Sequence, residues 1–290
     1  MRYLGGKSRT SKYIATDINS IAMLEGINNY YEPFVGGGNV VKEINIENRY
    51  ASDLNKYLIA FYNYICQDNF EDLPELTREQ CTYIKHNKDK YPDWYVYHAG
   101  INYGYRGIWF EGYDFNTDVV SLNIRLRDES KFFKDVNFRI YRYNEIDIKE
   151  PSIIYCDDPY IGTAGYGAVD KLKVINNVRK TTFDFDKYYE WLLKVAEHNL
   201  VFISEYIMPA DKFKCINSFV LDTTINSGLE NDNKDNKIEN LYVVRGGYLV
   251  DKYYPDDEDD DYDFWLWWWF VLSSRCLLCQ SCFNGITLEK

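Results

Sequence analysis

Two adjacent carboxylates interrupt an apolar run near the middle of the chain, and their position suits chemistry. The run Ile153-Ile154-Tyr155-Cys156 is followed at once by Asp157-Asp158-Pro159-Tyr160. A short apolar run that ends in turn residues predicts a strand buried on both faces. Ligands bind outside the carboxyl ends of such strands in open α/β sheets. The pattern therefore predicts a carboxylate, a proline turn and an aromatic ring at the mouth of a site, although an ordinary turn uses the same residue types.

A glycine pair followed by a lysine lies close to the N-terminus. Gly5 and Gly6 let the backbone approach a ligand, and Lys7 follows directly. Ser8 or Thr10 can cap the helix that the next residues predict. Such a loop at the start of a helix suits an anion. It is not a P-loop, because the first glycine of that longer spacing is missing.

A second glycine-rich turn follows the first expected strand. Residues 30–38 read Tyr-Tyr-Glu-Pro-Phe-Val-Gly-Gly-Gly, which predicts a strand, a turn that can hold a cofactor, and the start of a helix. A second strand then ends at Asp53, where such folds hold the hydroxyl pair of a ribose. Asp53 can equally be the N-cap of the helix that begins at Leu54. The full dinucleotide fingerprint is absent, so we do not expect a nicotinamide cofactor.

Helical and strand-like segments alternate along most of the chain, and this alternation predicts an α/β, Rossmann-like sheet. Apolar residues recur at helical spacing in residues 54–66 and 184–198. Strands are expected at residues 137–143 and 200–206, and an edge strand at 238–244. Three glycines in residues 162–170 predict a mobile loop beside the site.

A segment of different character separates the two halves of this pattern. Prolines, glycines and aromatic residues surround Arg106, and an expected helix over residues 121–134 carries Arg125 and Arg127. Bases beside aromatic rings suit contacts to phosphates and stacking on bases. The same residues also fit a loop-rich subdomain with ordinary surface charge. We interpret residues 57–136 as an inserted subdomain, and residues 1–56 with 137–255 as the main domain.

Composition limits the classes of protein that this chain can belong to. The 290 residues carry a net charge of −12, so any contact with DNA must come from a local basic face. No apolar run approaches the ~20 residues that span a bilayer, and no leader is visible, which predicts a soluble intracellular protein. The seven cysteines are odd in number and mostly scattered, which predicts reduced thiols.

The last 35 residues differ from the rest of the chain. An acidic run from residue 256 precedes the apolar run of residues 264–272, and Cys276, Cys279 and Cys282 follow at two-residue gaps. This spacing is known from metal ligation, but the fourth cysteine of the bacterial iron–sulfur run is missing. We expect no metal site, and interpret residues 256–290 as a tail outside the fold that derives from an altered reading frame.

Taken together and in order, four motifs resemble the Dam-type adenine-specific DNA methyltransferases. These are Gly-Gly-Lys, Glu-Pro-Phe-Val-Gly-Gly-Gly, Ser-Asp-Leu-Asn and Asp-x-Pro-Tyr, and the resemblance extends to about residue 245. It implies a Rossmann-like methyltransferase sheet with an inserted helical target-recognition subdomain. It also implies methyl transfer from S-adenosylmethionine to the exocyclic amine of adenine in double-stranded DNA. We expect a monomer in the cytoplasm of a bacterial or phage-infected cell, in a restriction–modification or phage setting.

The resemblance also implies a role for individual residues. Tyr3 and Lys7 line the cofactor site, and Lys7 faces the methionine carboxylate. Phe34 and the glycines from Gly36 to Gly38 cradle the cofactor. Asp53 holds the ribose of the cofactor. Asp157 lies beside the cofactor and accepts a hydrogen bond from the target amine, and Tyr160 stacks on the flipped base.

Asp158 departs from the family's motif, which has a proline before Pro159. Its backbone carbonyl can still accept a hydrogen bond from the amine, but the fixed φ of proline is lost and a second acid is gained. The sequence predicts that Asp158→Pro keeps or raises activity. Two alternatives to an active DNA enzyme are a weakly catalytic relative that binds DNA or cofactor, and a methyltransferase that acts on RNA or protein.

Overall fold

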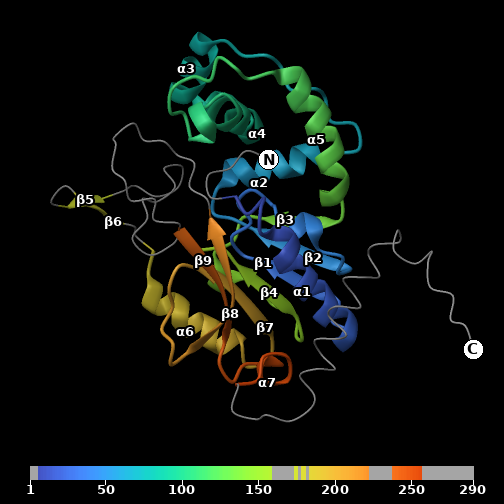
Figure 1. The fold of residues 1–290 in the computed structure, drawn as a ribbon. Helices are drawn as coiled ribbons and strands as arrows, with labels where there is room; N and C mark the ends of the chain where they lie inside the picture. The colour runs from blue at the N-terminus through green and yellow to red at the C-terminus, as the bar shows by residue number, and fades with distance from the viewer. Residues whose placement is uncertain (1–5, 159–172, 176–177, 181–182, 222–236, 257–290) are drawn as a thin grey trace, which may run out of the picture.

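A mixed sheet forms the centre of the computed structural model, which describes residues 6–158, 173–175, 178–180, 183–221 and 237–256 (Figure 1). Seven strands of the described residues lie in the order β3-β2-β1-β4-β7-β9-β8. Their bounds are β1 Asn29–Glu32, β2 Asn48–Ser52, β3 Val136–Arg139, β4 Ile153–Cys156, β7 Leu200–Glu205, β8 Phe213–Leu221 and β9 Lys237–Val244. The short strands β5 (Lys173–Ile175) and β6 (Val178–Lys180) pair only with each other.

The chain reverses its direction of travel across the sheet between β1 and β4. It runs outward from β1 through β2 to β3, and then returns to place β4 on the other side of β1. These strands and β7 are mutually parallel, with Tyr30 of β1 opposite Ile153 of β4. A ligand is expected at such a switch point, outside the carboxyl ends of the strands. The sheet alone therefore places a site after Glu32 and Cys156.

Alternating side chains of the buried strands enter two separate hydrophobic clusters. On β4, Ile153 and Tyr155 pack in one cluster, whereas Ile154 and Cys156 pack in the other. The first cluster includes residues of α1 (Ser11–Glu25) and α2 (Lys56–Ile65), and the second includes residues of α6 (Phe185–Val195). Because successive residues of a strand point to opposite faces, helices cover this sheet on both sides.

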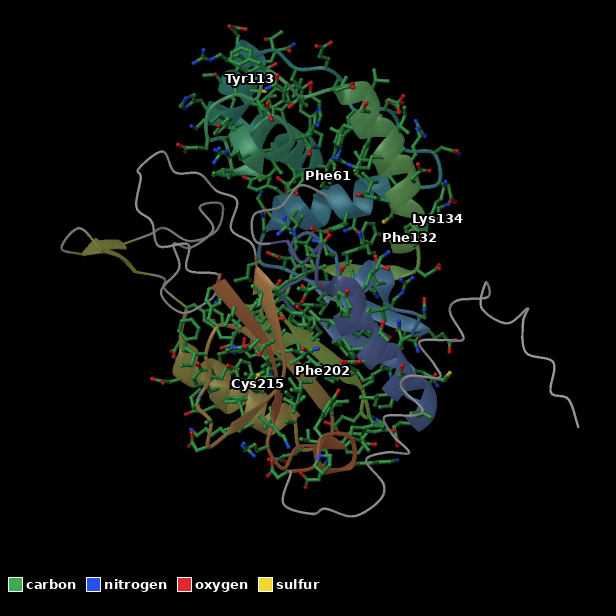
Figure 2. All side chains as sticks on the ribbon, viewed as in Figure 1. Phe61, Tyr113, Phe132, Lys134, Phe202 and Cys215 are labelled. Carbon is green, nitrogen blue, oxygen red and sulfur yellow. The ribbon has the colours of Figure 1, made fainter. Side chains whose placement is uncertain are left out.

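The helices α3 (Arg78–His86), α4 (Asp93–Tyr97) and α5 (Val119–Phe133) form a layer beyond α2 (Figure 1). Buried residues of α3, α4 and the following loop make a third hydrophobic cluster of their own. Phe61 of α2 is fully buried against Tyr97 of α4, with ring centroids 4.6 Å apart, so α2 joins this layer to the sheet (Figure 2). The remaining bounds are η2 Lys88–Lys90, η3 His98–Asn102 and η4 Tyr105–Gly107.

Several local expectations need correction. The strand expected at the sheet edge, β9, lies between β7 and β8, because β8 pairs along its outer side. The glycine turn after β1 leads only into the 3-10 turn η1 (Val41–Glu43) and not into a full helix. Asn55, not Asp53, caps α2, since its side chain accepts from two backbone N–H groups of the first turn. Thr10 stands at the N-cap of α1 without a side-chain cap bond.

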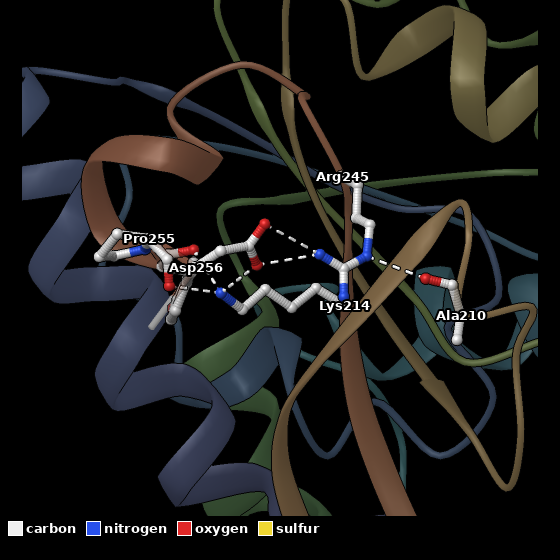
Figure 3. Close-up of polar contacts among 6 residues, drawn as sticks. Ala210, Lys214, Arg245, Pro255 and Asp256 are labelled. Atoms are coloured by element: carbon white, nitrogen blue, oxygen red, sulfur yellow. Dashed lines mark hydrogen bonds and ion pairs between the residues drawn. The ribbon is translucent and has the colours of Figure 1, made fainter. Parts of the chain in front are cut away.

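The described chain ends in an anchored segment. The last described helix is α7 (Val250–Tyr253), and the last described residue is Asp256. The short 3-10 turn η5 (Tyr143–Glu145) lies earlier, between β3 and β4. The carboxylate of Asp256 pairs with Lys214 at 2.8 Å and with Arg245 at 2.9 Å (Figure 3). The tail from residue 257, its three cysteines, and the glycine loop of residues 162–170 lie outside the described residues. Within the described part of the chain, no helix combines the length and apolarity that a bilayer crossing requires.

Candidate active site

The two central acids point to opposite faces of the sheet, as strand geometry predicts. Asp157 continues the face of Ile153 and Tyr155, and Asp158 continues that of Ile154 and Cys156. Asp157 accordingly bonds Lys7, which precedes α1, whereas Asp158 bonds Tyr188 on α6. The neighbouring carboxylates therefore belong to different environments and do not act as one pair.

Lys7 lies between two carboxylates from distant strands. Its Nζ is 2.6 Å from Oδ1 of Asp157 and 3.2 Å from Oε1 of Glu239. Burial by itself lowers the pKa of Lys7, but the two carboxylates outweigh burial and raise that pKa above its usual range. Side-chain exposure is 6% for Lys7 and 3% for Glu239, against 21% for Asp157. Asp157 is therefore the member of this ion-paired group that reaches the surface.

Glu239 reaches this group because β9 runs antiparallel to β7. Asn240 of β9 lies opposite Glu205, the last residue of β7, so the first residues of β9 lie at the carboxyl edge of the parallel strands. Glu239 shares a face with Leu241 and Val243, which pack in the same cluster as Tyr155. Alternation along β9 thus directs Glu239 toward Lys7.

A further acid on this face is held in a protonated state. Glu32 ends β1, is buried, and accepts a hydrogen bond from the hydroxyl of Tyr30 at 2.7 Å. Burial first, and then the charge of Asp157, raise the pKa of Glu32 to about 8. At pH 7 this carboxyl is therefore mostly neutral, and it adds little negative charge to the group around Lys7.

Asp158 is enclosed on the other face. It is 4% exposed, and its Oδ1 accepts a hydrogen bond from the hydroxyl of the fully buried Tyr188 at 3.0 Å. Burial, followed by the charge of Glu205, raises the pKa of Asp158 well above its usual range. Burial thus favours the neutral form of this carboxyl, and its side chain packs against Tyr188 on α6.

Asp53 ties two loops together at the end of β2. Its Oδ2 accepts from the backbone N–H of Gly36 at 3.3 Å, and its Oδ1 accepts from that of Asn55 at 2.8 Å. Burial raises the pKa of Asp53, and the same N–H groups oppose this rise. The carboxylate therefore fixes the glycine turn against the start of α2 while each oxygen keeps capacity for a further donor.

The glycine turn is shaped by packing as well as by Asp53. Gly36 and Gly38 have φ of 44° and 65°, a region that side chains rarely adopt. A Cβ on Gly38 would lie 2.5 Å from the hydroxyl of Tyr62, which itself donates to the carbonyl of Gly36 at 2.9 Å. Phe34, just before the turn, packs edge-on against Tyr188 with centroids 5.7 Å apart. The turn is therefore a rigid unit between both faces of the sheet.

Comparison with models of protein families gives one match to this chain. Residues 3–125 match the family model described as D12 class N6 adenine-specific DNA methyltransferase. Over these residues the chain matches the family that its motifs resemble. The matched residues include Lys7, the glycine turn and Asp53, and end before β4. A search among curated proteins returned no match.

The chain is thus an adenine-specific DNA methyltransferase with DNA as its substrate. Among the catalytic and cofactor residues that its sequence predicts, the structure gathers Lys7 and Asp157 at one point, and Asp53 with the glycine turn at another. Tyr3, Pro159 and Tyr160 lie outside the described residues. Their roles remain predictions.

The three arginines predicted to bind DNA lie in the helical subdomain of the methyltransferase. Arg106 is exposed beside the ring of Tyr105, 5.2 Å from its centroid, and has a φ of 56°. Arg125 and Arg127 lie on α5, and each has a carboxylate within 4.0 Å. DNA contact by these arginines stays a prediction.

Sequence reasoning missed three residues of this site, Glu32, Glu239 and Tyr188. Each lies in a strand or helix that the sequence predicts. It becomes a partner of a central acid only because its side chain lies on the same face of the sheet as that acid. Counting in steps of two from Tyr155 assigns Asp157 and Asp158 to their faces. The same count within residues 238–244 assigns Glu239 to one face of its strand, but the partner strand could not be read from the sequence.

Proposed function

We propose that this methyltransferase binds S-adenosylmethionine and modifies adenine in double-stranded DNA at the carboxyl edge between β1 and β4. The observation that carries the proposal is the arrangement of Asp157, which is fixed by Lys7 at 2.6 Å and yet remains partly exposed. A fixed and accessible carboxylate is what an acceptor for a substrate amine requires.

The residues around this edge fit a cationic nucleoside cofactor. Asp157 and Glu239 both lie at this edge beside Lys7, and acids near the site favour a sulfonium cation. The hydroxyl of Tyr97 is buried and has no hydrogen-bond partner among the described residues. Burial and then the charge of Asp53 raise the pKa of Tyr97, which places this hydroxyl near the acid expected to hold the ribose. When bound, the cofactor supplies an electrophilic methyl group.

Each residue of the proposed cofactor site has a separate task. Asp53 accepts from the ribose hydroxyls, and the turn from Gly36 to Gly38, with Phe34 before it, forms the wall on which the cofactor lies. Tyr3 completes the site by resemblance. Lys7 positions Asp157 through their ion pair, in addition to the contact with the methionine carboxylate that the resemblance implies.

The adenine amine needs help because its lone pair is delocalised into the ring. Asp157 and the backbone carbonyl of Asp158 accept hydrogen bonds from this amine, which favours a tetrahedral nitrogen with an available lone pair. Positioning then carries much of the rate effect. The base must leave the duplex, at a cost of a few kcal/mol, and Tyr160 returns about 1–3 kcal/mol by stacking. Pro159 fixes the turn between Asp158 and Tyr160.

The wider assignment follows the same proposal. Residues 57–136 recognise the DNA target, and residues 1–56 with 137–255 carry catalysis. The enzyme acts as a monomer on DNA in the cytoplasm of a bacterial or phage-infected cell.

The test is a methyl-transfer assay on duplex DNA with labelled S-adenosylmethionine, followed by identification of the methylated base. Asp157→Ala is expected to lower the rate by a factor on the order of 10² to 10⁴, since it removes a positioned acceptor. Asp211→Ala, at an exposed acid between β7 and β8, serves as the matched control and keeps the rate. Full activity of Asp157→Ala would refute the assignment of the site.

A further inference from the structure

The helical subdomain carries two groups of basic residues, and their surroundings differ. Every base in the first group, on and just after α5, faces an acid. The pairs are Arg125–Glu129 at 4.0 Å, Arg127–Asp72 at 2.6 Å, Lys131–Asp128 at 2.9 Å and Lys134–Asp68 at 2.8 Å. Figure 2 shows Lys134 beyond the end of α5. Acids of the same surface thus offset the positive charge of this helix.

The second group, on α3 and η2, lacks such neutralisation. Lys85 donates to the carbonyl of Phe110 at 3.1 Å, and Lys88 donates to the carbonyl of Lys85 at 2.7 Å. Lys90 donates to the hydroxyl of Tyr83 at 3.4 Å. Over residues 6–158 and the other described segments, no carboxylate oxygen lies within 4.0 Å of these three ammonium groups. Neutral oxygens hold the lysines in place, but their charge remains available to an anion.

Two of these lysines, Lys85 and Lys88, border a hollow of about 470 Å³ between α2 and η2. Lys56, Lys85 and Lys88 line it together with two aspartates, of which Asp93 already pairs with Lys56 at 2.9 Å. The other lining residues are Tyr57, His86, Asp89 and Tyr91. In a chain whose net charge is −12, a concave surface with more lysines than acids is a local attraction for anions.

The hollow lies close to the proposed site. Lys56 follows Asp53 by three residues, so their Cα atoms are at most about 11 Å apart. That distance corresponds to about three steps of 3.4 Å along one DNA strand. The hollow therefore lies within the length of a few nucleotides of the acid proposed to hold the ribose of the cofactor.

We propose that the hollow between α2 and η2 binds backbone phosphates of the substrate duplex through Lys85 and Lys88. This inference rests on the proposed function, since it assumes that the duplex approaches the carboxyl edge of the sheet. Phosphate contacts set the register and orientation of the protein on DNA without reading its sequence. The surface therefore positions the duplex, and other residues of the subdomain read the target.

The experiment compares two double variants of the full chain, Lys85→Gln/Lys88→Gln and a matched control, Lys187→Gln/Lys194→Gln, at two exposed lysines of α6. Glutamine keeps a hydrogen-bond donor for the carbonyl partners of Lys85 and Lys88 while it removes the charge. Fluorescence anisotropy measures the affinity for a labelled duplex between 50 and 200 mM salt. The slope of log affinity against log salt is about −0.9 for each phosphate contact. Loss of two contacts should make the slope less steep by about 1.8. When salt rises fourfold, the affinity of the wild type should therefore fall by a factor about ten times larger than the factor for the Lys85/Lys88 variant.

The result expected is a flatter slope for the Lys85/Lys88 variant and an unchanged slope for the Lys187/Lys194 control. An unchanged slope for the Lys85/Lys88 variant, or an equal flattening in the control, would overturn the proposal. Urea unfolding of both variants confirms that neither substitution disturbs the fold. Because DNA binding is measured without methyl transfer, failure of this surface is distinguishable from failure of the proposed reaction, which Asp157→Ala tests.

Discussion

Replacing Asp158 by proline restores the family's usual motif, but the structure predicts a cost that the sequence does not show. The hydroxyl of Tyr188 is fully buried and donates to Asp158 at 3.0 Å. A proline at position 158 cannot accept this hydrogen bond through a side chain. The substitution therefore leaves a buried hydroxyl without its partner beneath the catalytic turn.

The free energy of unfolding reflects two opposing effects. An unsatisfied buried hydroxyl costs about 1–3 kcal/mol. A proline that fits its backbone position returns about 0.4–1 kcal/mol by restricting the unfolded chain. The net loss for Asp158→Pro is therefore up to about 2.5 kcal/mol. The cost comes from the hydroxyl of Tyr188, which loses its hydrogen bond to Asp158. Removing the hydroxyl of Tyr188 in the double variant Asp158→Pro/Tyr188→Phe should recover most of the lost free energy of unfolding.

Urea unfolding of the wild type, both single variants and the double variant measures the coupling between the two positions. We expect a coupling free energy of about 1–3 kcal/mol, since the residues share one buried hydrogen bond. The rate of methyl transfer is measured for the same four proteins at saturating cofactor. Among the three variants, the double variant should have the highest rate. The sequence-based expectation for Asp158→Pro thus becomes conditional on Tyr188. Additive single effects would show that the hydrogen bond does not hold the turn, and would refute this reasoning.

Four further predictions concern other parts of the molecule. Burial raises the pKa of Glu32 to about 8, so its contribution to stability is full below about pH 4.5 and lost as the pH rises toward 8. Glu32→Gln lacks this loss, so its unfolding free energy relative to the wild type should rise by a few kcal/mol from pH 5 to pH 8; a constant difference in urea titrations would contradict this prediction. Asp53→Ala should weaken binding of S-adenosylmethionine by about 1–3 kcal/mol in calorimetry, since a hydrogen bond to a charged group is lost, and equal binding would remove Asp53 from the cofactor site. A chain that ends after Asp256 should keep cofactor binding and be more soluble, because the Trp-rich run is removed. A chain that ends after Tyr254 should melt at a lower temperature, since the pairs of Asp256 with Lys214 and Arg245 are lost; equal melting would show that this anchor is dispensable.

Local signals in the sequence predicted the strands that carry the acids. The apolar run before Asp157 and the turn residues after it suffice to place this acid at the end of a strand, and Asp53 follows its strand in the same way. The α/β class is confirmed, because alternating helices and strands build the sheet. These features depend on neighbours in the sequence, which is why residue patterns predict them.

Features that depend on distant pairing escaped prediction. The place of β9 inside the sheet depends on β8, whose mixture of Lys214, Asn217 and Ser218 with apolar residues gave no strand signal. The charge of α5 was read from its bases, whereas Asp68 and Asp72 from the preceding loop offset two of them. Such pairs form only after the chain has folded, so counting charges along the sequence overestimates the basic character of this helix.

The ion pairs of Lys7 also have a consequence for how the enzyme is made. Lys7 and Glu239 are 232 residues apart in the sequence, and β9 must enter the sheet between β7 and β8, which both precede it. At roughly 5–20 residues per second, a ribosome adds Glu239 roughly ten to fifty seconds after Lys7. During that interval Lys7 and Asp157 can meet, but the second carboxylate and the strand that carries it are absent. A nascent chain therefore cannot complete the ion-paired group around Lys7 until β9 has been synthesised.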